Sequence, residues 1–159
     1  MAAKLKRDRF FWTIALQTFV VNFFLGGFGP AQTLLREDQG TSLVVAGLHG
    51  TSMGIASIVS GLTLARLSHR YGRANTGWIG LVVFSIGLVG VATLPTAAMT
   101  ISATFITGFG ISTVINSFVT SFNHHYGAKA PLALGQANGF ASMGYVTGTL
   151  TIGTIAEAA

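Results

Sequence analysis

The side chains of this chain that could do chemistry are few, and most of them are uncharged. Gln17, Asn22 and Asn116 lie inside long apolar stretches, and His49 is the ionisable side chain deepest within one. Polar groups in such surroundings usually face a bundle interior or a wet cavity, so all four are candidates for lining a solute path. A histidine can also change charge near physiological pH, which makes a proton-linked role conceivable for His49.

A structural explanation of the same residues stays open. Each amide could form a hydrogen bond across two helices without touching any solute. His49 could be a neutral, hydrogen-bonded histidine near the outer end of its helix.

The sequence shows none of the patterns that mark an enzyme. It contains no nucleophile–base–acid set, no phosphate-binding loop and no zinc signature. It has no cysteine, which excludes disulfides and thiolate metal sites. His124 and His125 are adjacent, but two histidines do not make a metal site without further ligands. We therefore expect no enzymatic activity, no cofactor and no metal.

The polar candidates sit in stretches long enough to cross a bilayer. Only 8% of residues are charged and 50% are hydrophobic, whereas soluble domains carry about 25% charged residues. Four stretches are free of Asp, Glu, Lys and Arg, and the longest holds two spans separated by the turn signal Leu94-Pro95-Thr96. Since a spanning helix needs about 20 apolar residues, the sequence predicts an all-α polytopic transmembrane helix bundle of five spans, at residues 10–34, 43–67, 77–94, 98–122 and 133–156.

The basic residues predict the orientation of this bundle. They gather in residues 1–9, after the second span and after the fourth span: Lys4, Lys6, Arg7, Arg9, Arg66, Arg70, Arg73 and Lys129. Only Arg36 falls on the other side, beside Glu37 and Asp38. Basic loops stay in the cytoplasm, so residues 1–9 form a cytoplasmic basic N-terminus and the protein is multi-pass in a plasma or inner membrane. This topology accounts for the net charge of +5, and we predict no nucleic-acid binding.

Paired glycines mark the helix faces that can approach closely. Gly50 and Gly54 form such a pair in the second span, and Gly144 and Gly148 form one in the fifth. Small residues four apart let membrane helices pack with their backbones close together. We interpret these four as helix-packing glycines; the alternative is that their faces slide or rock.

The connection between the second and third spans carries a family resemblance. It reads Ala65-Arg-Leu-Ser-His-Arg-Tyr-Gly-Arg73, which resembles the G-x-L-a-D-R-x-G-R motif of the major facilitator superfamily of secondary transporters. Leu67, Arg70, Gly72 and Arg73 match the motif, whereas His69 replaces its acid. In the family that acid joins a charge-relay contact that latches the cytoplasmic side. A histidine cannot supply the negative charge.

The resemblance extends along nearly the whole chain. Thr107-Gly-Phe-Gly110 resembles the glycine pair of the family's fourth helix, and the region from Gly135 resembles its glycine-rich fifth helix. The match implies the N-terminal part of a major facilitator fold, about the first five of twelve helices. Five spans fall one short of a six-helix half, so we expect the sequence to continue beyond Ala159.

The function implied by the resemblance is alternating-access transport of a small solute, by a chain that is a fragment of such a transporter. The first and fourth helices line the path in this family, which favours Gln17, Asn22 and Asn116 as path residues. The expected partners are the lipid bilayer, the solute, and a missing C-terminal half or a second copy. The alternative is a non-transporting membrane scaffold or accessory subunit derived from such a half. It is favoured by His69 and by the lack of an intramembrane carboxylate.

Overall fold

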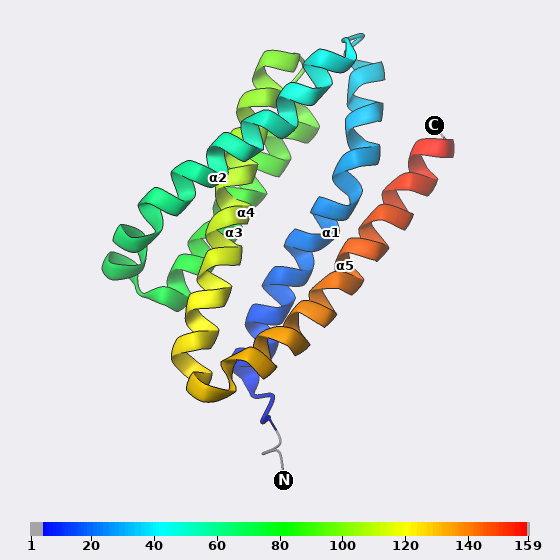
Figure 1. Ribbon diagram of the computed structural model, residues 1–159. Coiled ribbons are helices and arrows are strands. Elements are labelled where there is room, and N and C mark those ends of the chain that lie inside the picture. Colours follow the sequence, from blue (N-terminus) through cyan, green and yellow to red (C-terminus); the bar gives the residue numbers. More distant parts are fainter. Residues whose placement is uncertain (1–4, 159) are drawn as a thin grey trace.

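The computed structural model describes residues 5–158, so Lys4 and Ala159 lie outside the described residues. All regular structure in this range is helical, which confirms the predicted fold class. The helices are α1 (Arg9–Asp38), α2 (Leu43–Tyr71), α3 (Arg73–Thr93), α4 (Ala97–Tyr126), the short 3-10 helix η1 (Gly127–Lys129) and α5 (Ala130–Ala158). Successive long helices run in opposite directions across the molecule (Figure 1).

The apolar character of these helices agrees with a membrane protein. Four continuous helical segments are long and apolar enough to cross a bilayer. The last of them, Ala97–Ala158, comprises α4, η1 and α5. The chain reverses direction between α4 and α5 (Figure 1). The described residues therefore form five long helices.

The helices extend beyond the predicted spans at most of their ends. The largest difference lies at residues 68–76, predicted as a connection, where α2 continues to Tyr71 and α3 begins at Arg73. Only Gly72 separates them, with a φ of 83° that a residue with a side chain rarely adopts. Hydropathy identifies only the part of a helix that lipid covers. It does not detect the polar turns by which a helix continues into the headgroup region.

Three helix pairs hold the bundle together: α1 with α5, α3 with α4, and α2 with α4. At the end where α1 begins, Phe11 of α1 packs with Phe118 and Phe122 of α4. Further along, Val21 of α1 packs in a second cluster with Val114 of α4. α4 therefore lies at the centre, in contact with every other helix.

The α1–α5 pair is joined through backbone contact. A Cβ built on Gly144 would lie 2.5 Å from the carbonyl oxygen of Phe19. A Cβ on Gly148 would overlap the carbonyl oxygen of Phe23, and one on Gly26 would overlap that of Tyr145. Because only hydrogen fits at these positions, glycine sets the separation of the two helices.

Candidate functional site

The central helix α4 carries most of the buried polar side chains. Hydroxyl groups recur along the faces that it turns to its neighbours, at Thr100, Thr104, Thr107, Ser112, Thr113, Ser117 and Ser121. Burial of a hydroxyl is costly without a hydrogen bond. Most of these groups donate to a carbonyl of their own helix, and some also reach a neighbouring helix.

A row of hydroxyl contacts links α2 to α4. Ser52 Oγ donates to the Ile101 carbonyl at 2.8 Å, and Ser112 Oγ donates to Ser57 Oγ at 2.7 Å. Ser60 Oγ and Thr113 Oγ1 lie 2.9 Å apart. Sequence reasoning missed these residues. The available signal was the recurrence of Ser and Thr in the second and fourth spans, which is typical of hydrogen-bonded membrane helices.

His49 extends this row toward the start of α2. Its Nε2 lies 2.9 Å from Thr100 Oγ1 of α4, and its Nδ1 lies 3.2 Å from the Ala46 carbonyl. A carbonyl only accepts, so Nδ1 donates its proton in this contact. The Thr100 hydroxyl also lies 3.1 Å from the Ala97 carbonyl of its own helix. Gln39, in the α1–α2 connection, donates to the same Thr100 oxygen at 3.3 Å. The imidazole is buried, and each of its nitrogens lies within hydrogen-bond distance of a partner.

Gln17 lies where α1, α3 and α4 converge. A Cβ built on Gly77 of α3 would lie 3.2 Å from both Gln17 Oε1 and Ser117 Oγ of α4. The Ser117 hydroxyl donates to the Arg73 carbonyl at 2.6 Å. Gln17 is buried in this three-helix contact.

Asn22 and Asn116 are half-buried and lie at similar depths. They follow Val21 and Ile115, which belong to the same apolar cluster between α1 and α4. Asn22 Nδ2 donates to the Thr18 carbonyl of its own helix at 2.8 Å, and no hydrogen bond within residues 5–158 engages its amide oxygen.

The four polar candidates are therefore not brought into one pocket. His49 lies near the start of α2, the two asparagines lie near the middle of α1 and α4, and Gln17 lies nearer the start of α1. A groove of about 500 Å³ between α1 and α3 contains none of the four. Its walls are apolar and rich in phenylalanine, including Phe23, Phe24, Phe28 and Phe84.

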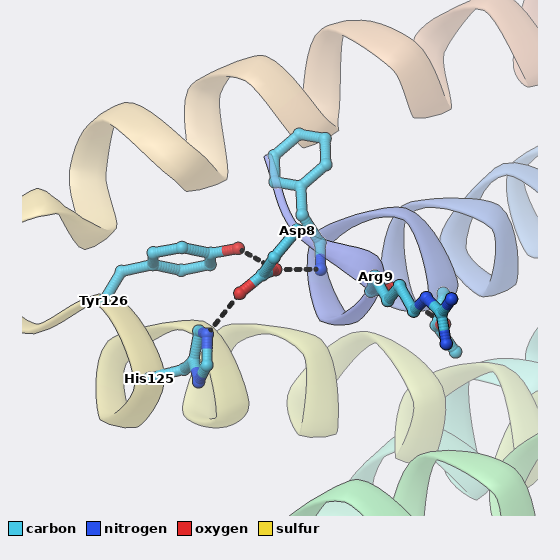
Figure 2. A network of polar contacts seen from close by, with 6 residues as sticks. Asp8, Arg9, His125 and Tyr126 are labelled. Atoms are coloured by element: carbon cyan, nitrogen blue, oxygen red, sulfur yellow. Dashed lines mark hydrogen bonds and ion pairs between the residues drawn. The ribbon is translucent and has the colours of Figure 1, made fainter. Parts of the chain in front are cut away.

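A polar clasp joins the start of α1 to the end of α4 (Figure 2). The Asp8 carboxylate accepts the Phe11 backbone N–H at 2.9 Å, capping α1. It also lies 2.9 Å from His125 Nε2 and accepts the Tyr126 hydroxyl at 2.9 Å. The Phe11 N–H, followed by the hydrogen bonds from His125 and Tyr126, lowers the pKa of Asp8 from 3.8 to about 2. Nearby, Arg7 Nε donates to Gln136 of α5 at 2.9 Å. Sequence reasoning missed this clasp, although an Asp three residues before Phe11 is a typical helix cap.

The loop-motif residues form the corner between α2 and α3. Leu67, His69 and Arg70 occupy the last turn of α2, Gly72 makes the turn, and Arg73 begins α3. His69, Arg70 and Arg73 are exposed, and the Arg70 guanidinium lies 5.5 Å from the centre of the Tyr71 ring.

The predicted packing glycines fall in two different environments. Gly144 and Gly148 contact the backbone of α1, as described above. A Cβ built on Gly54 would meet open space. A Cβ built on Gly50 would lie 4.0 Å from Gln32 Nε2 and near no other atom. Within the described residues, the α2 pair thus faces outward while the α5 pair is covered.

Comparison with known families identifies one relationship. The model of the Major Facilitator Superfamily matches residues 14–159, nearly the whole chain. Comparison with curated proteins and with solved structures found no match.

Proposed function

The chain belongs to the major facilitator superfamily, and from this membership we propose that it forms one wall of the solute path of an alternating-access secondary transporter. It is a multi-pass membrane protein of the transporter type. The observation that carries the proposal is the family match over residues 14–159 of a bundle in which α1 and α4 share an apolar core. Such folds place the solute near the bilayer midplane, between two bundles that rock.

Asn22 and Asn116 are the path residues that we propose. They lie near the middle of α1 and α4, are half-buried, and retain amide groups that no contact within residues 5–158 uses fully. Such amides can bind neutral or zwitterionic small solutes through hydrogen bonds. Gln17 and His49 belong to the same proposal as supporting residues, because their surroundings hold them in contacts between helices.

A second bundle completes the path in this proposal, supplied by a C-terminal half or by a second copy. Large apolar side chains on α5, such as Met143, Val146 and Leu150, are exposed. Lipid or another bundle has to cover them.

The first experiment tests water access and orientation. The sequence contains no cysteine, so single-cysteine variants of the full chain can be labelled with maleimides, which react only where water reaches the thiol. We expect Asn22→Cys and Asn116→Cys to be labelled, and the exposed apolar control Leu62→Cys not to be. A membrane-impermeant maleimide should reach Thr96→Cys from outside, but His124→Cys only after permeabilisation. If neither asparagine position reacts, the path assignment fails; reversed access to positions 96 and 124 refutes a cytoplasmic N-terminus.

The second experiment tests transport itself. The full chain in proteoliposomes is offered radiolabelled sugars, amino acids, organic anions and organic cations, with and without a proton gradient. We expect saturable uptake of at least one class, and its loss in Asn22→Leu and Asn116→Leu at similar protein levels. The accessory-subunit alternative, which the absence of any carboxylate from residue 39 to 156 favours, predicts no uptake and a partner that co-purifies in fixed ratio.

A further inference from the structure

The cytoplasmic corner between α2 and α3 concentrates positive charge without a carboxylate to balance it. Arg66, His69, Arg70 and Arg73 all lie exposed within eight residues of sequence. The four acids of the chain are Asp8, Glu37, Asp38 and Glu157.

None of these acids neutralises the corner. Asp8 already binds the Phe11 N–H, His125 and Tyr126. Glu37 and Asp38 lie at the end of α1, across the bundle from this corner. There Glu37 is 3.9 Å from Arg36. Within residues 5–158, no hydrogen bond or ion pair engages the side chains of the corner arginines.

The exposed face of α2 changes from apolar to basic as it approaches this corner. Ile58, Leu62, Arg66 and Arg70 follow one another at intervals of four residues, which places them in a stripe along one side of the helix. Ile58 and Leu62 are 65% and 77% exposed. A stripe that changes from aliphatic to cationic over about 6 Å, the rise of four residues, matches the change from acyl chain to headgroup in a lipid.

Aromatic residues mark the same level of the membrane. Tyr71 ends α2 beneath the Arg70 guanidinium, and Trp78 lies exposed in the second turn of α3. Tyrosine and tryptophan gather at the membrane–water interface, where the ring meets acyl chains and the polar end meets water. The arginines therefore lie at headgroup depth.

We propose that this corner is a binding site for an anionic phospholipid, whose acyl chain lies along Ile58 and Leu62 and whose phosphate is bound by Arg66 and Arg70. Arg73, across Gly72, adds charge from the start of α3. Arginine suits this role because its planar fork of N–H donors binds two phosphate oxygens at once. The site is independent of the solute path, so it can be tested without a known solute.

The test measures lipid retained by the purified full chain in mild detergent, using native mass spectrometry with phosphatidylglycerol and phosphatidylcholine as probes. We expect preferential retention of phosphatidylglycerol. Each basic residue near an anionic headgroup contributes about fivefold to binding, so Arg66→Gln/Arg70→Gln should weaken retention by about thirtyfold. The matched control, Arg36→Gln at the opposite end, should leave it unchanged. Arg66→Lys/Arg70→Lys keeps both charges and should retain most of the binding, which separates loss of charge from loss of folding.

Four results would overturn the proposal. The first is equal retention of the two lipids by the unmodified chain. The second is an equal effect of the Arg66/Arg70 and Arg36 substitutions. The third is displacement of phosphatidylglycerol by excess inorganic phosphate, which would make the corner a phosphate site rather than a lipid site. If the glutamine pair instead dissociates a second bundle while lipid retention stays constant, the stripe is a protein interface and the lipid assignment is wrong.

Discussion

Replacement of Gly148 by alanine should separate α1 from α5 and destabilise the bundle. A Cβ at this position would overlap the Phe23 carbonyl oxygen and lie 2.8 Å from its carbon, where ordinary contact begins at 3.4 Å. The backbones must therefore move apart by about 0.6 Å (3.4 minus 2.8) or more. A backbone carbonyl cannot rotate away as a flexible side chain can, so the strain spreads along the α1–α5 contact. Overpacking of this kind costs about 1–3 kcal/mol.

Gly153→Ala is the matched control on the same helix. No atom lies within 4 Å of a Cβ built there. Both variants gain similar helix propensity, up to about 1 kcal/mol for Gly→Ala, so the difference between them isolates the clash. The assay is thermal unfolding of the full chain in mild detergent, followed by circular dichroism. At about 2–4 °C per kcal/mol for a chain of this size, Gly148→Ala should melt about 2–12 °C below Gly153→Ala. Equal melting temperatures would refute the view that backbone contact at Gly148 sets the α1–α5 separation.

Two further predictions concern polar contacts. Asp8→Ala should destabilise the fold by about 1 kcal/mol through loss of the α1 cap alone, measured by thermal unfolding at neutral pH. Because folding lowers the pKa of Asp8 from 3.8 to about 2, its contribution is complete above about pH 4 and disappears as the pH falls toward 2. The difference in stability between the unmodified chain and Asp8→Ala should therefore disappear over that pH interval. An undiminished difference at pH 2 would contradict the role given to the ionised Asp8 carboxylate. For the 2.9 Å contact between Ser60 and Thr113, a double-mutant cycle with Ser60→Ala and Thr113→Val should give a coupling of about 0.6 kcal/mol. A coupling of zero would show that the two hydroxyls satisfy themselves within their own helices.

The helical fold was predictable because charge is excluded from long stretches of the sequence. A bilayer demands this exclusion, so the signal is direct. Helix ends were less predictable. At the α2–α3 corner, the basic turn that signals a cytoplasmic connection is itself helical up to Tyr71, because water and lipid headgroups tolerate helical backbone as readily as they tolerate a loop.

The surroundings of the polar residues were not predictable from the sequence. Gly54 and Gly148 belong to the same four-residue spacing pattern, yet Gly54 faces open space and Gly148 faces the backbone of α1. The pattern shows which faces can approach closely, and the topology decides which of them meet. A buried hydroxyl poses the same difficulty: Thr107 bonds only its own helix, whereas Ser52 reaches across to α4. Both uses satisfy the group, so residue type cannot distinguish them.

The distribution of these contacts also predicts which helices of the bundle stay together when it moves. α5 is held to α1 by glycines against backbone, and α2 is held to α4 by side-chain hydroxyls and His49. Motion within either pair would break close packing or buried hydrogen bonds along much of a helix. The small residues Gly135, Gly139 and Gly153 lie instead on an open face of α5, where an added Cβ would meet nothing within 4 Å. Sliding there costs no contact within this chain. In the alternating access that we propose, α1 with α5 and α2 with α4 should therefore each move as one unit, with the moving surface on this open face of α5.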